Sequence, residues 1–208
     1  MIRSVLASSA VVLAGLVLVP AVGRAQGMTE SQPKVWLGGH LGLSPIGTLK
    51  AEILDQSMTF DASPAFEIGG HVEIQLTPLV SIGVAPAVMF HIKASDDNDS
   101  ASELDLPLRV IVGGNVAPRV RLYGFAAPGY TIEFLPDTGT IDIGHPHGFM
   151  IGFGGGIAYR VAPRVALTGE LGYQFRFLSE TVQGPLGSVD ITQQNNYLTF
   201  GFGVMAGL

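Results

Sequence analysis

The segment FEIGGHVEIQL, from Phe66 to Leu76, alternates between two kinds of side chain. One set is Phe66, Ile68, Gly70, Val72, Ile74 and Leu76, and the other is Glu67, Gly69, His71, Glu73 and Gln75. Because successive side chains of a β-strand point to opposite faces, the segment predicts a strand with one apolar and one polar face. The fold then depends on which of the two faces is turned inward.

Seven other segments have the same period of two, and their connections alternate in length. The eight predicted strands are Lys34–Ser44, Pro64–Thr77, Leu79–Lys93, Glu103–Gly113, Arg119–Phe134, Gly148–Val161, Arg164–Leu178 and Asn195–Leu208. Tight turns follow the second, fourth and sixth strands, and each contains a proline (Pro78, Pro118 and Pro163). Long polar stretches follow the others, at 45–63, 94–102, 135–147 and 179–194. This pattern predicts an antiparallel up-and-down sheet with short turns at one end and long loops at the other.

The content of the two faces favours a membrane barrel. On these strands the apolar face carries no lysine, arginine, aspartate or glutamate, whereas the polar face holds Glu67, Glu73, Lys93, Glu103, Asp105, Arg109, Arg121, Glu133, Glu170 and Arg176 among many small residues. Small residues with a few charges suit the narrow interior of a closed eight-stranded sheet, and the apolar face then meets lipid. We therefore expect an all-β, eight-stranded antiparallel up-and-down transmembrane β-barrel. The alternative is a secreted lipocalin-like carrier with the apolar face inside.

Composition and the N-terminus narrow the class further. The chain is 47% hydrophobic, only 13% charged and free of cysteine, which excludes disulfides and cysteine zinc sites. Residues 1–25 place Arg3 before an apolar run that ends in small residues, which predicts a signal peptide cleaved after Ala25 and a barrel over residues 26–208. Without Arg3 and Arg24, 9 of the 11 basic residues remain against 17 acidic ones, a formal charge of −8 that argues against nucleic-acid binding.

The architecture from about Lys34 to Leu208 resembles the small outer-membrane β-barrel family of the OmpA transmembrane domain and OmpX. The last strand, YLTFGFGVMAGL, is similar to that family's C-terminal assembly signal, with Gly203 and a final hydrophobic residue, Leu208, in place. It departs from the pattern in ending on leucine rather than phenylalanine and in carrying Ala206 where an aromatic is usual. The resemblance implies a monomer in the bacterial outer membrane, in contact with membrane lipid, lipopolysaccharide and the assembly machinery. No peptidoglycan-binding domain follows, so that role of OmpA is not implied.

Charged residues on the inward face predict a plugged lumen. Counted from the short turns, Glu73, Arg109, Arg121 and Glu170 all lie in the lower to middle part of the barrel, where two carboxylates face two guanidinium groups. His40, His71 and Gln75 are neighbours that satisfy further donors and acceptors. We expect this ionic cluster to plug the lumen, so that the barrel conducts few ions. A large conductance would indicate a small porin instead.

Candidate metal, cation and phosphate sites are weaker than this cluster. His145 and His147 form a metal site only if a third ligand such as Asp142 joins them, and a solvated loop is preferred. The acidic stretch with Asp96, Asp97, Asp99 and Glu103 suits Ca²⁺ or lipopolysaccharide-bridging cations, but its spacing matches no known loop. The glycine-rich segment 152–160 lies within a strand and lacks the GK[ST] ending of a phosphate loop. We predict no metal and no cofactor.

Enzymes remain the second class of function. A lipid A deacylase needs serine, histidine and a carboxylate on the lipid face, and the apolar face is almost bare of such groups. A palmitoyl transferase near the loops could recruit His91, Ser95 and Asp97, but no spacing singles them out. We therefore expect a structural or surface protein whose loops, chiefly 45–63 and 179–194, mediate adhesion or binding.

Overall fold

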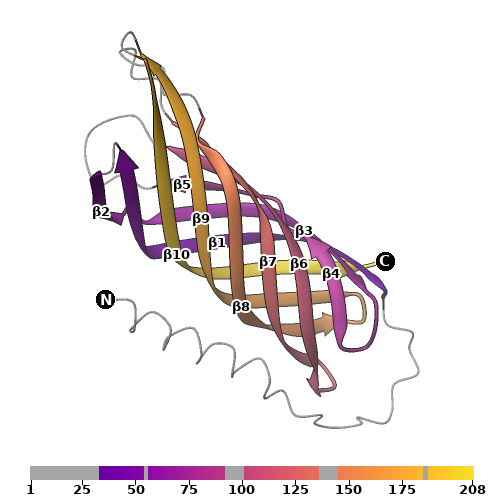
Figure 1. The fold of residues 1–208 in the computed structure, drawn as a ribbon. Coiled ribbons are helices and arrows are strands. Elements are labelled where there is room, and N and C mark those ends of the chain that lie inside the picture. Colours follow the sequence, from indigo (N-terminus) through magenta and orange to yellow (C-terminus); the bar gives the residue numbers. More distant parts are fainter. Residues whose placement is uncertain (1–32, 54–55, 92–100, 136–144, 185–186) are drawn as a thin grey trace, which may run out of the picture.

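The computed structural model describes residues 33–53, 56–91, 101–135, 145–184 and 187–208, and the expected signal peptide lies outside them. These residues form ten strands, all paired antiparallel (Figure 1). They are β1 (Val35–Ile53), β2 (Gln56–Ala62), β3 (Ala65–Gln75), β4 (Val80–Val84), β5 (Ala87–His91), β6 (Ser102–Ala117), β7 (Val120–Phe134), β8 (His147–Ala162), β9 (Val165–Gly184) and β10 (Gly187–Gly207). No helix in the described part of the chain is long and apolar enough to cross a membrane.

The sheet closes on itself because β1 pairs with both β10 and β3. β4 and β5 lie in succession between β3 and β6, so they form one barrel strand that is interrupted at Ala85 and Pro86. Proline cannot donate to the ladder, but its carbonyl accepts from Gly70 N at 2.9 Å. Among the described strands, β2 pairs with β1 alone, and it lies outside the ring. The ring therefore has eight strands, and the predicted fold class is confirmed.

Apolar side chains cover the outside of the barrel. Exposed large side chains from around the ring include Leu41, Ile74, Leu108, Leu122, Leu171 and Phe202. At the end opposite the short turns, Phe66 lies opposite Phe90 and Phe149 lies opposite Phe177, so aromatic pairs border this belt. The lipocalin-like alternative requires the apolar face inside, and the structure places it outside.

Several strands extend beyond the belt at the long-loop end. Residues 45–63 and 179–194 were expected as loops, and this is wrong: β1 and β2 form one hairpin and β9 and β10 form a longer one, as Figure 1 shows. The alternation continues through both, but its polarity reverses. A register shift between Leu43 and Ile46 changes which residues of β1 face outward. Above it the exposed Lys50 and Glu52 follow the outward face, while Leu49 and Ala51 are half-buried on the inward face. An outer wall that changes from apolar to polar is the pattern of a strand that leaves lipid for water.

Candidate functional site

Two of the predicted lumen residues form an ion pair across the barrel. Arg109 on β6 donates from Nη2 to Glu170 Oε1 on β9 at 2.8 Å, and the hydroxyl of Tyr123 donates to the same oxygen at 2.7 Å. The Arg109 guanidinium also lies 4.2 Å from the ring centroid of Phe125. The Glu170 carboxylate therefore accepts hydrogen bonds from two strands, β6 and β7, and these bonds connect opposite walls of the barrel.

A second pair lies nearer the short turns. Arg121 on β7 donates to Glu73 on β3 at 2.8 Å and to the Ser81 hydroxyl at 3.2 Å. His71 Nε2 lies 3.7 Å from the other Glu73 oxygen. The sequence left the pairings open, and the structure joins Arg109 to Glu170 and Arg121 to Glu73. We call these two pairs and His71 the lower ionic layer.

His40 makes a contact that the sequence did not suggest. Its Nε2 lies 2.7 Å from Glu67 Oε1, so the partner of His40 is a carboxylate outside the predicted cluster. All six predicted cluster residues, including His40 and His71, thus have a charged neighbour in the lumen. Whether they stop ions from passing is a functional prediction that these contacts support without testing it.

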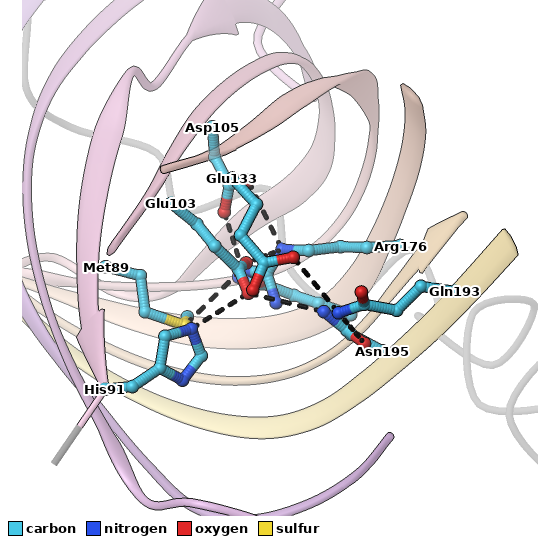
Figure 2. A network of polar contacts seen from close by, with 9 residues as sticks. Met89, His91, Glu103, Asp105, Glu133, Arg176, Gln193 and Asn195 are labelled. Atoms are coloured by element: carbon cyan, nitrogen blue, oxygen red, sulfur yellow. Dashed lines mark hydrogen bonds and ion pairs between the residues drawn. The ribbon is translucent and has the colours of Figure 1, made fainter. Parts of the chain in front are cut away.

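A second and more deeply buried layer lies toward the long-loop end, and Figure 2 shows its side chains converging from opposite walls. Arg176 has no exposed side-chain surface; its Nε lies 2.9 Å from Glu103 Oε2 and its Nη2 donates to Asp105 Oδ2 at 2.6 Å. Glu133 is 5% exposed and accepts from Gln193 at 3.0 Å. Further members of this upper ionic layer are Met89, His91, Gln174 and Asn195.

The upper ionic layer was missed as a cluster, although its charged members were recognised as inward-facing. The layer holds three carboxylates and one guanidinium, that of Arg176, which contacts Glu103 and Asp105, whereas the predicted lower pairs balance two against two. The sequence signal was the position of Glu103, Asp105 and Arg176 on the polar face close to the ends of their predicted strands. Their common height depends on strand tilt and register, which the alternation does not give.

Two small cavities lie in the lumen. One of about 70 Å³ lies between the two ionic layers and is lined by Arg109 and Glu170 on one side and Asp105 on the other. Another of about 50 Å³ lies at the short-turn end, lined by Trp36, Glu73 and Arg121 among others. Trp36 is 8% exposed at this end and packs on Ala166 and Met205. The lumen thus holds pockets the size of a few water molecules between ion pairs.

Close backbone approach fills the remaining interior. A Cβ atom on Gly154 would overlap the Leu171 carbonyl oxygen and lie 2.7 Å from the Cα of Gly172. Gly203, predicted as part of the assembly signal, is similarly confined, since its Cβ would lie 2.9 Å from the Gly39 carbonyl oxygen. Leu208, the other predicted element of the signal, is 68% exposed at the end of the chain. Their role in assembly stays a prediction.

The remaining candidates from the sequence do not form a site in the described residues. His147 Nδ1 lies 3.0 Å from the carbonyl oxygen of His145, and Asp142 lies outside the described ranges. His91 contacts Glu103 at 2.9 Å, while Ser95 and the acidic Asp96, Asp97 and Asp99 also fall outside those ranges. Within the part of the chain that the structure describes, no group of three or more histidine, cysteine, aspartate or glutamate residues could hold a metal ion.

Comparison with known proteins identifies the fold but no sequence family. No protein-family model and no curated protein matches the chain. Among solved structures, Neisserial surface protein A (NspA) superimposes with a TM-score of 0.54 at 14% identity, covering 84% of this chain and 97% of that one. The outer membrane protein OprG from Pseudomonas aeruginosa gives a TM-score of 0.53 at 12% identity, covering 83% of this chain and 96% of that one. The chain thus has the fold of small outer-membrane β-barrels, whereas membership of the OmpA and OmpX family stays a resemblance.

Proposed function

We propose that this chain is a bacterial outer-membrane surface protein with a closed lumen, whose projecting sheet at the long-loop end binds a partner. The observation that carries the proposal is the position of Met58 and Phe60 on β2. They are 48% and 51% exposed although they follow the inward face of a strand beyond the lipid belt. Met58 and Phe60 lie on the same face of β2, and contiguous apolar patches exposed in water mark interaction surfaces.

These two side chains belong to a continuous inner surface. Phe60 lies opposite Leu49 and Met58 lies opposite Ala51 on β1, and β1 in turn pairs with β10. β2 pairs with no described strand other than β1, so its second edge also offers backbone donors and acceptors. An apolar face beside a strand edge that no described strand pairs with suits an extended segment of another protein, which adds backbone hydrogen bonds to side-chain contacts.

The proposed location follows from the belt and the two ends. The apolar outer wall suits lipid, and the expected signal peptide of residues 1–25 accounts for export. In this topology the short turns and both ends of the mature chain lie in the periplasm, and the hairpins project from the cell. The proposed partners are outer-membrane lipid, lipopolysaccharide and the assembly machinery, and the proposed state is a monomer.

A non-enzymatic role fits the placement of His40, His71 and His91. The contacts of His40, His71 and His91 with carboxylates all lie in the lumen among other charged groups, away from the lipid face where an acyl chain would lie. A lipid-modifying enzyme needs such a pair beside a nucleophile at the lipid surface. The second candidate, a small porin, requires that the two ionic layers leave a continuous water path.

The test combines fractionation with surface behaviour. Recovery in the outer-membrane fraction and a heat-dependent shift on a detergent gel are expected. The double variant Met58→Ser/Phe60→Ser should reduce the attachment of intact cells to polystyrene and hexadecane, whereas Thr59→Ser on the opposite face of β2 should not. Attachment equal to wild type in the double variant would overturn the surface role, and recovery as a soluble protein would overturn the location.

A further inference from the structure

The two ends of the barrel carry opposite charge. In the described extension at the long-loop end, the acidic side chains are Glu52, Asp61, Glu180 and Asp190, and the basic one is Lys50. At the short-turn end, Lys34, Arg119 and Arg164 are exposed. An anion near this molecule is therefore attracted to the short-turn end.

A cavity at that end concentrates the positive charge. Arg119, Arg121 and Arg160 line the space of about 50 Å³ beside Trp36 and Tyr123. Glu73 is the one acidic residue in its described lining, and Arg121 already bonds it at 2.8 Å. Three guanidinium groups and one carboxylate thus lie in the described lining, so basic groups outnumber acidic ones there.

The residue type and the size of the space select the ligand. A guanidinium presents a planar fork of donors that matches phosphate and carboxylate oxygens. The cavity has room for about four water molecules, which suits a single anionic group rather than a whole metabolite.

We propose that this cavity, lined by Arg119, Arg121 and Arg160, is a binding site for a phosphate-type anion. The backbone supports the arrangement, because Arg160 N donates to the Arg119 carbonyl oxygen at 2.8 Å and so holds the β6–β7 turn against β8. The anion is either a free phosphate or the phosphate of an anionic lipid headgroup, since both present the same oxygens. The proposal does not depend on adhesion at the other end, and the two fail separately.

Trp36 provides the measurement, because it is the only tryptophan in the chain and lines the cavity. Protein in dodecylmaltoside is titrated with inorganic phosphate, and protein in nanodiscs of phosphatidylcholine is compared with protein in discs that also contain phosphatidylglycerol. We expect a saturable change in Trp36 emission. Its midpoint should rise at least tenfold in Arg119→Gln/Arg160→Gln and stay unchanged in Lys50→Gln, which removes one positive charge from the opposite end.

The arms also identify the source of the anion. A response to inorganic phosphate identifies a soluble ligand, and a response to phosphatidylglycerol discs alone identifies a headgroup. Arg119 is exposed in a turn, so Arg119→Gln alone tests the site if the double variant fails to fold, with a several-fold rise in the midpoint expected. Absence of any response in both arms, or equal midpoints in wild type and Arg119→Gln, would overturn the proposal.

Discussion

At the scale of single residues, Arg176 shows how a charge is kept inside this barrel. It is fully buried, and Glu103 and Asp105 both lie within ion-pair distance of it. Removing one partner of a buried ion pair leaves the remaining charges buried without a counter-charge. The stability lost in this way is far greater than the intact pair contributes. Its guanidinium also lies 4.9 Å from the ring centroid of Tyr197, so it packs as well as pairs.

Arg176→Met should therefore destabilise the barrel by about 3–5 kcal/mol, because two carboxylates lose their shared counter-charge. Urea unfolding followed by Trp36 fluorescence measures the free energy of unfolding. The matched control is Arg164→Met, which removes an exposed arginine from a turn and should change stability little. Equal effects of the two substitutions would mean that water reaches the upper ionic layer freely.

Gly154 and Gly169 test how tightly the interior is filled. A Cβ on Gly154 would lie 2.7 Å from the Cα of Gly172, whereas on Gly169 the nearest atom would be 3.7 Å away, on Ile157. Gly154→Ala should thus cost about 1–3 kcal/mol through overpacking, and Gly169→Ala should be nearly neutral. The same urea titration compares them, and a neutral Gly154→Ala would show that the walls can move apart.

At the scale of elements, the reversal of polarity along the strands marks where lipid ends. Val72→Arg or Leu167→Arg, on the outer wall of β3 and β9, should block assembly, because a charge near the bilayer midplane costs about 2–4 kcal/mol. Thr192→Arg is the control, since Thr192 is exposed on β10 beyond the belt. Heat-dependent gel migration after refolding into liposomes reports assembly. Normal assembly of both belt variants would place the lipid boundary elsewhere.

The same reversal explains what could be predicted from the sequence. The eight barrel segments were recognisable because lipid and lumen impose opposite polarity on alternate residues, as in β3. Beyond the belt the outward positions of β10 are polar, as at Thr192 and Gln194, because they face water, and a polar stretch of this kind predicts a loop. The β-branched Val182, Val189 and Ile191 were a signal for strands that the composition of the segment concealed.

The break between β4 and β5 and the pairing of the charged residues could not be predicted from the sequence, for two different reasons. Pro86 lies within a segment that alternates without interruption, so its effect on the ladder depends on the neighbouring strands. Arg109 and Glu170 are 61 residues apart, and Arg176 and Asp105 are 71 apart. Alternation shows that such residues face inward but not which ones meet, because the meeting point depends on the tilt and register of the closed sheet.

At the scale of the whole molecule, the two ionic layers lie one after the other along the lumen. The cavity of about 70 Å³ between them is lined by residues of both, including Arg109 from the lower layer and Asp105 from the upper. An ion that passes one layer still meets the other. The proposed closed lumen then has two barriers in series, which predicts that opening one of them changes conductance little while the other remains closed.

This arrangement leads to a prediction about conductance in planar bilayers. Wild type, Arg109→Leu and Arg176→Met should each show no large, stable conductance, because each retains at least one intact layer. The double variant Arg109→Leu/Arg176→Met loses both principal counter-charges, and the freed Glu170, Glu103 and Asp105 draw in water and cations. It should conduct and prefer cations, since carboxylates then dominate the lumen.

Lys50→Gln, at the long-loop end outside both layers, is the control and should behave as wild type. A large wild-type conductance would mean that water passes the ion pairs unhindered and would make the chain a small porin. Conductance in Arg176→Met alone would mean that the lower ionic layer is no barrier.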